Sequence, residues 1–204
     1  MTIHLYKNDL PADLELAGDI AVDTETQGLN LHRDRLCLLQ LSAGDGVCHM
    51  VHFPEASYEA PNLKRLLADP ARKKILHFAR FDVAIVQRDL GVTMAPVFCT
   101  KIASKLVRTY TDRHGLSNIV KEVLDIDMSK QQQSSDWANA DLSEAQLTYA
   151  ASDVLYLHRL RDALESMLIR ENRLDLAQAC FDFLPTRSSL DLAGWEDTDI
   201  FAHS

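Results

Sequence analysis

The sequence lacks the features that mark membrane, secreted and disulfide-rich proteins. No run approaches the roughly 18 apolar residues that a membrane span needs, and the first ten residues lack the basic segment and apolar run of a secretory signal. The 4 cysteines form no CxxC pair, so neither a disulfide framework nor a zinc site is expected. We therefore expect a soluble, cytoplasmic protein with reduced thiols, in which any metal is bound through oxygen.

Linkers, internal repeats and low-complexity tracts are also missing. The 7 glycines and 6 prolines are scattered singly over 204 residues. A chain of this length buries about 70% of the surface that its unfolded form exposes, so it needs no disulfide to fold. We expect a single domain over residues 1–204, with a motif-bearing core at about 19–160 and a helical tail at about 161–204.

Basic residues are scarce, since 21 Lys and Arg stand against 30 Asp and Glu and give a net charge of -9. That total disfavours a protein that coats long nucleic acids, because Lys and Arg supply most of the non-specific affinity for phosphate. The charge is uneven, however: residues 64–135 carry 13 basic and 7 acidic side chains, against 3 and 10 before them and 5 and 13 after them. A basic block of this kind is typical of a nucleic-acid-binding face. A solvated charged surface is the alternative.

The hydrophobic pattern predicts an α/β fold with a mixed sheet. Short apolar runs predict strands at 19–24, 36–42, 47–53 and 74–78, and the turn at 43–46 makes the second and third a hairpin. Helical spacing predicts helices at 62–68, 81–90, 100–108 and 116–124. A long amphipathic helix is predicted from Ser143 to about Asn172, begun by a capping box of Ser143 and Gln146. Strands first, then alternating strands and helices, then helices alone indicate this fold class.

Two acidic residues lie at the end of the first predicted strand. In the run AVDTET, Asp23 and Glu25 are two residues apart, so their side chains project from one face of a strand. Two neighbouring carboxylates repel each other unless a cation lies between them. Hard divalent cations prefer such oxygen ligands. A solvated pair of acids at a strand edge is the alternative for this motif taken alone.

Two further motifs supply acidic residues. Asp82 begins a helix directly after a predicted strand, and Asp153 follows Tyr149 by four residues, which puts both on one helical face. That face continues through Leu157 and Leu160 and so points inward, where an unpaired acid would be costly. Taken alone, Asp82 would stabilise a helix N-terminus, and Tyr149 would be a core tyrosine.

Together, Asp23, Glu25, Asp82, Tyr149 and Asp153 resemble the motifs of the DEDD-type 3′-to-5′ exonucleases, in the DEDDy subclass whose third motif carries a tyrosine. The resemblance covers about 19–160, and the sequences RLCLLQLS, SSDW and YAASDVLYLHRL resemble the ribonuclease D group. Over its full length the chain is similar to the short-oligonucleotide exoribonucleases called nanoRNases. The resemblance implies a ribonuclease H-like mixed sheet flanked by helices.

The resemblance also implies a mechanism. The four carboxylates of Asp23, Glu25, Asp82 and Asp153 would hold two divalent cations, Mg²⁺ or Mn²⁺, which activate water and stabilise the leaving 3′ oxygen. Tyr149 would orient that water and help to deprotonate it. Glu25 would also accept a hydrogen bond from the terminal 3′-hydroxyl. Zinc is disfavoured because no soft ligand belongs to these motifs.

Eight residues are predicted to bind substrate: Thr26, Leu29, His77, Arg80, Arg108, Tyr110, Arg113 and His114. Leu29 matches the apolar position that wedges between the last two bases in relatives, and a loop leucine tucked into the core is the alternative. The cationic and aromatic residues of 108–114 suit phosphate and base contact, and some of the eight would cap a 5′-phosphate. Lys101, Lys105 and Lys130 are either further phosphate contacts or solvated charges.

The predicted function is the hydrolysis of very short RNA, dinucleotides above all, by a homo-octamer that the resemblance implies. Trimming of longer RNA or of single-stranded or duplex DNA ends, in the manner of ribonuclease D, is the alternative. A catalytically silent nucleic-acid-binding domain is disfavoured, because all four carboxylates and the tyrosine are present. Ribonuclease D carries additional C-terminal RNA-binding domains, for which the about 40 residues after the exonuclease region are too few. A dinucleotide offers few phosphates, so an acidic net charge is compatible with it.

Overall fold

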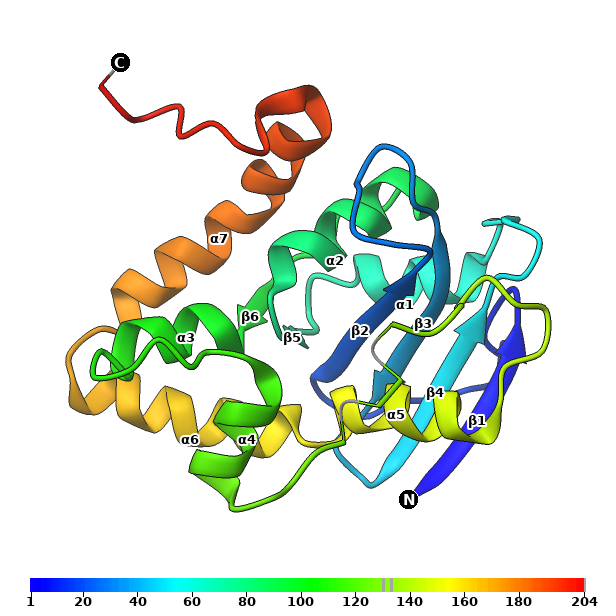
Figure 1. Cartoon of the computed structure of the whole chain (residues 1–204), viewed down its shortest axis with the longest axis horizontal. Coiled ribbons are helices and arrows are strands. Elements are labelled where there is room, and N and C mark those ends of the chain that lie inside the picture. The colour runs from blue at the N-terminus through cyan, green and yellow to red at the C-terminus, as the bar shows by residue number, and fades with distance from the viewer. Residues whose placement is uncertain (130, 133, 204) are drawn as a thin grey trace.

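The centre of the fold is a mixed six-stranded sheet in the order β1-β4-β3-β2-β5-β6 (Figure 1). The computed structural model describes residues 1–129, 131, 132 and 134–203, so the predicted contact Lys130 lies outside the described residues. The strands are β1 (Thr2–Lys7), β2 (Ile20–Thr26), β3 (Leu36–Ser42), β4 (Val47–His52), β5 (Lys74–Leu76) and β6 (Val97–Cys99). β3 is antiparallel to β2 and β4, whereas β1 and β4, β2 and β5, and β5 and β6 pair in parallel. This sheet confirms the predicted α/β class.

Burial along the central strands shows where the sheet meets solvent. Every residue of β3 is buried, since both faces of the strand are covered. In β2 only Asp23 and Glu25 keep partial exposure, and the other five residues are buried. The apolar part of β2 therefore anchors the strand in the core, and the two acids lie where the core opens.

Helices lie on both sides of this sheet. They are α1 (Pro61–Ala68), α2 (Ala79–Ile85), α3 (Thr100–Val107), α4 (Leu116–Leu124), α5 (Glu144–Leu155), α6 (Leu157–Arg170) and α7 (Leu174–Leu190), with π-helical turns at Val86–Leu90 and Asp191–Trp195. In Figure 1, α5 crosses in front of the strands and α1 lies behind them. α5 packs against β2, β3 and β4, and α7 packs against α2 and α3. No helix in the described part of the chain is long and apolar enough to cross a membrane.

The long helix predicted from Ser143 to Asn172 is wrong in its length, because the chain bends at Tyr156 and forms two helices. The predicted capping box is confirmed: the Ser143 side chain accepts from the Gln146 backbone, and the Gln146 side chain accepts from the Ser143 backbone. α5 lies across the sheet, whereas α6 packs against α3 and α4. The bend at Tyr156 (φ −101°, ψ −6°) lets each half follow a different neighbour.

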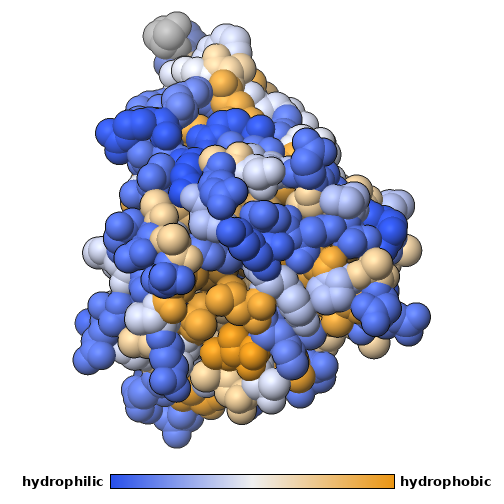
Figure 2. All heavy atoms as spheres, turned by 90° about the vertical axis from the view of Figure 1, so that its right-hand side faces the viewer, coloured by the Kyte–Doolittle hydropathy of each residue, from blue (hydrophilic) through white to orange (hydrophobic). Residues whose placement is uncertain are grey.

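Three elements had no prediction of their own: β1, β6 and α7. β1 is an edge strand without a buried residue, β6 is only 3 residues long, and α7 falls within the tail predicted to be helical. Figure 2 views the molecule from the side on which β1 lies and shows an apolar patch within a mostly hydrophilic surface. Met1 and Leu5 are among the exposed large hydrophobic residues of this N-terminal region.

Candidate active site

Three acidic side chains converge where β2 passes under α5. Asp23, Glu25 and Asp153 each offer a carboxylate oxygen, and these oxygens all lie within 4.8 Å of one another. Asp23 and Glu25 come from alternate positions of one strand, and Asp153 comes from the helix packed on it. Oxygen ligands at this spacing suit a hard divalent cation.

Asp82 joins the cluster from the first turn of α2. It is 4% exposed, and the Thr24 hydroxyl donates a hydrogen bond to its Oδ1 at 2.6 Å. The sequence analysis did not single out Thr24. Its position between Asp23 and Glu25 places its side chain on the opposite face of the strand, and this alternation was the signal that its hydroxyl faces a different element. The structure thus gathers all four predicted carboxylates, three at close range and Asp82 beside them.

Burial is the main cause that raises the pKa of each of the four carboxyl groups. The neighbouring negative charges raise the pKa of Asp23, Glu25 and Asp153 further. The hydrogen bond from Thr24 acts in the opposite direction on Asp82, because it favours the charged form. A divalent cation would relieve this repulsion, because it would supply positive charge between the carboxylates, which none of the described residues does.

Tyr149 lies one helical turn before Asp153 on α5, and its hydroxyl lowers the pKa of Asp153 and so favours the ionised form. Burial and the charge of Asp153 raise the pKa of Tyr149, so its hydroxyl is protonated at neutral pH. Trp137, from the motif SSDW, is buried with its ring 6.2 Å from the Tyr149 ring. A cavity of about 560 Å³ opens beside Tyr149 and is also lined by Ser152 and Tyr156.

Two of the predicted substrate-binding residues are histidines held by hydroxyls of α3. Nδ1 of His77 lies 2.9 Å from the Thr100 hydroxyl, and Nδ1 of His114 lies 2.9 Å from the Ser104 hydroxyl. Burial, and then the charge of Lys101, lower the pKa of His77 to about 3, so its ring is neutral. The structure therefore brings His77, His114 and Lys101 together beside α2, where Asp82 lies.

Leu29 is 83% exposed, which excludes the alternative of a leucine tucked into the core. It lines a cavity of about 480 Å³ together with Phe78, Arg80 and Phe81. Thr26, by contrast, is buried, and its hydroxyl donates to the Gly28 carbonyl. Leu29 is thus available to a ligand, whereas Thr26 shapes the loop that presents it.

Arg80 has a protein partner in the structure. Its guanidinium donates to the carboxylate of Asp191 at 2.8 Å and to the Glu196 carbonyl at 2.6 Å. Asp191 is buried and also accepts from Arg187. The donors of Arg80 therefore hold the C-terminal turn against α2.

The expected phosphate contact of Arg108 needs correction, because its side chain is 0% exposed. Its guanidinium donates to Glu122, to the Ser104 hydroxyl at 2.9 Å and to the Arg113 carbonyl at 2.8 Å. This buried network gives Arg108 a structural role. Tyr110 is exposed, and its hydroxyl donates a hydrogen bond to Glu122, which also accepts from Arg108. The side chain of Arg113 is exposed as well.

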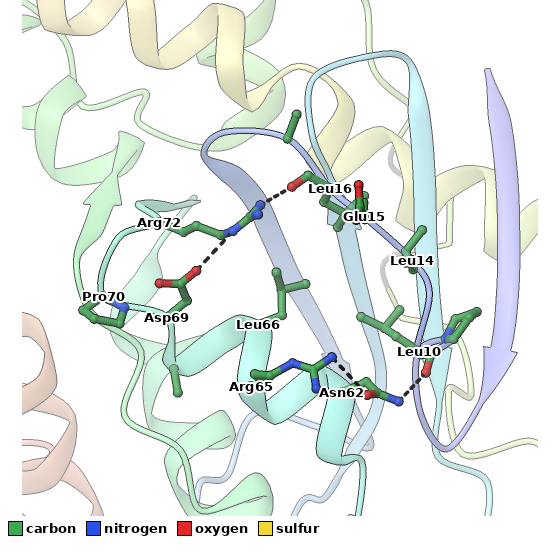
Figure 3. A pocket seen from close by; sticks show the side chains of 13 residues that line it. Leu10, Leu14, Glu15, Leu16, Asn62, Arg65, Leu66, Asp69, Pro70 and Arg72 are labelled. Carbon is green, nitrogen blue, oxygen red and sulfur yellow. Dashed lines mark hydrogen bonds and ion pairs between the residues drawn. The ribbon is translucent and has the colours of Figure 1, made fainter.

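A cavity of about 800 Å³, larger than those beside the carboxylates, lies between residues 10–17 and α1 (Figure 3). None of the carboxylates lines it. Its arginines serve the fold, since Arg72 donates to Asp69 and to the Leu16 carbonyl, and Arg65 donates to Asn62. The chemistry of the carboxylate cluster, and not cavity size, therefore identifies the candidate active site.

Residues 6–169 match the 3′-5′ exonuclease family. Ribonuclease D of Acidiphilium cryptum is 34% identical over 156 residues, which cover 76% of this chain. The chain spans 39% of the length of this curated relative.

Solved structures of one relative match over the whole chain. NrnC (nanoRNase C) of Brucella melitensis bound to pGG is 57% identical with a TM-score of 0.96, and the same protein with bound Mg²⁺ is 56% identical with a TM-score of 0.95, each covering 100% of both chains. Ribonuclease D of Escherichia coli is 25% identical with a TM-score of 0.72, over 83% of this chain and 44% of that one. These matches confirm the predicted ribonuclease H-like fold. The chain belongs to the 3′-5′ exonuclease family, in its DEDD-type, ribonuclease D-like group.

Proposed function

We propose that this chain hydrolyses very short RNA from the 3′ end, dinucleotides above all, and releases nucleoside 5′-monophosphates. The observation that carries the proposal is the gathering of four carboxylates and a tyrosine in a chain that matches NrnC bound to pGG over its full length. pGG is a ligand of two nucleotides, which agrees with a site made for short substrates.

Asp23, Glu25, Asp82 and Asp153 would hold two divalent cations, Mg²⁺ or Mn²⁺. The donor set fits such ions, because it consists of carboxylate oxygens that repel one another without a counter-charge. When bound, the cations supply an activated water and charge stabilisation at the leaving 3′ oxygen. Glu25 would in addition accept a hydrogen bond from the terminal 3′-hydroxyl, so that a free 3′ end is required.

Tyr149 would orient the attacking water through its hydroxyl oxygen. With its proton directed toward the Asp153 carboxylate, the hydroxyl would keep its oxygen lone pairs free to accept a hydrogen bond from water. Because the pKa of Tyr149 is raised, the tyrosine assists deprotonation by holding the water in place. Packing of the Trp137 ring against Tyr149 keeps the hydroxyl in position.

Substrate contacts would come from two groups of residues. Leu29, exposed beside Phe78 and Phe81, would separate the two bases. His114 and Lys101 would donate hydrogen bonds to phosphate oxygens. The neutral His77 ring would stand beside them with its Nδ1 proton donated to the Thr100 hydroxyl, which itself donates to the Leu76 carbonyl. The exposed Arg113 is the arginine of 108–114 that is available to cap a 5′-phosphate.

Incubation of 5′-labelled RNAs of two to seven nucleotides with Mg²⁺ tests this function. We expect the dinucleotide to disappear fastest, and Asp23→Ala to abolish hydrolysis without unfolding the chain. Glu15→Ala, which removes an exposed acid that lines the cavity at residues 10–17 and is not part of the carboxylate cluster, is the control and should retain activity. Persistence of the dinucleotide while longer RNAs shrink would favour the trimming of longer ends, and parallel DNA oligomers would test the sugar preference.

The resemblance also supports a cytoplasmic homo-octamer as the working form. Light scattering of the purified chain measures this directly. A mass near 22.9 kDa would be that of a monomer and would contradict the octamer.

A further inference from the structure

Gln40, in the run RLCLLQLS, is a buried polar residue to which the carboxylate motifs assign no role. It lies in the middle of β3 and is 0% exposed. Neither its Nε2 nor its Oε1 has a hydrogen-bond partner among the described residues. Leaving a buried polar group unpaired costs about 1–3 kcal/mol, so the position of this amide requires an explanation.

The register of the sheet places Gln40 directly opposite Asp23. Directly opposed residues of antiparallel strands project from the same face, with Cβ atoms about 4.5–5.5 Å apart. α5, which carries Tyr149 and Asp153, covers this face, since it packs on both β2 and β3. Gln40 therefore lies on the same face of the sheet as Asp23, on the neighbouring strand and under α5.

Two other carboxylates of the cluster have a side chain that orients them. The Thr24 hydroxyl donates to Asp82, and the Tyr149 hydroxyl, on the same helical face as Asp153, lowers the pKa of that carboxyl. No side chain among the described residues donates a hydrogen bond to Asp23. Carboxylates that bind metals are regularly oriented by such outer hydrogen-bond donors.

We propose that Gln40 is the positioning residue of Asp23. Its Nε2 donates to the Asp23 carboxylate, directly or through one water, when the cluster binds a cation. The inference rests on the proposed function, because it requires that Asp23 be a cation ligand. A neutral amide suits this role, since it orients the carboxylate without the positive charge with which Lys or Arg would compete with the cation.

Calorimetric titration of the full chain with Mn²⁺ tests the inference. Gln40→Met removes the amide and keeps a side chain of similar volume. We expect Mn²⁺ affinity to fall roughly 10–100-fold, while stability to urea without cations stays equal or rises, because an unpaired buried amide is removed. Leu39→Met is the matched control, since Leu39 lies opposite Thr24 and so on the other face of β3. Its Mn²⁺ affinity should equal that of the wild type.

Activity gives a second measurement. In Gln40→Met, kcat at low Mg²⁺ should fall and should recover at high Mg²⁺, with KM for the dinucleotide unchanged. A purely structural role predicts the reverse pattern, namely lower stability with unchanged Mn²⁺ affinity, and this result would overturn the proposal. Gln40→Leu is the second variant, and failure of both variants to fold would also overturn it. If the wild type binds no Mn²⁺, the cation site fails together with this inference, whereas equal binding by wild type and Gln40→Met refutes the inference alone.

Discussion

The hydroxyl of Thr24 donates a hydrogen bond to Asp82 at 2.6 Å and joins β2 to α2 across 58 positions of sequence. Successive residues of a strand point to opposite faces. Thr24 therefore projects away from the face that carries its neighbours Asp23 and Glu25. One short strand thus supplies two carboxylates to the cluster and the hydroxyl that orients a third.

Thr24→Val should weaken cation binding. The substitution keeps the shape of the side chain but leaves the buried Asp82 without its donor. We expect Mn²⁺ affinity to fall roughly 10-fold and the free energy of unfolding to fall by about 1–3 kcal/mol when Asp82 is ionised. Calorimetry and urea unfolding measure the two quantities. Thr24→Ser keeps the hydroxyl and should bind Mn²⁺ like the wild type; equal behaviour of the two variants would show that the hydrogen bond has no such role.

Tyr149→Phe should lower kcat and leave KM for the dinucleotide unchanged. Loss of a group that positions a proton transfer costs about 10²–10⁴ in rate. Steady-state kinetics with excess Mg²⁺ measures the effect. Tyr58→Phe is the control, because the Tyr58 hydroxyl donates to the Leu36 carbonyl and not to a carboxylate of the cluster. A kcat of Tyr149→Phe close to that of Tyr58→Phe would refute the assignment.

Arg80→Met should destabilise the chain and leave KM unchanged. Asp191 is buried and would lose one of its two arginine partners, with Arg187 remaining. We expect the free energy of unfolding to fall by about 1–3 kcal/mol. Urea unfolding and dinucleotide kinetics on the same preparation distinguish a structural role of Arg80 from a role in binding substrate. A higher KM with unchanged stability would instead assign Arg80 to substrate phosphate.

Stability without cations should fall as the pH rises. Burial is the main cause that raises the pKa of Glu25 to about 9 and that of Asp82 and Asp153 to about 7, so the folded chain holds protons that the unfolded chain has lost. This contribution to stability is complete below about pH 4, the range of free carboxyl groups, and is lost as the pH rises through the folded values.

Urea unfolding in EDTA over about pH 5–9 measures this effect. Saturating Mg²⁺ should abolish the decline, since the cation replaces the protons. Glu25→Gln should flatten the upper part of the curve, because it removes the carboxyl with the highest of these values. Stability that rises across this range in the wild type would contradict the proposed cluster.

The hydrophobic pattern was sufficient to predict the α/β fold class, and the acidic motifs together with their family resemblance predicted that the four carboxylates and the tyrosine would lie in one cluster. The direction of a side chain along a strand or helix is a local property, so the spacing of Asp23 and Glu25, or of Tyr149 and Asp153, determines which pairs share a face. The apolar run before Asp23 likewise determined that β2 would be anchored in the core.

Only the tertiary structure decided what surrounds these residues. Arg108 became a buried structural residue because Glu122 lies beside it, and the helix after Ser143 bends at Tyr156 because its halves pack on different elements. The places of Thr24 and Gln40 depend on which strands pair and in what register. Such pairing joins segments far apart in the sequence through long-range packing, which local periodicity does not encode.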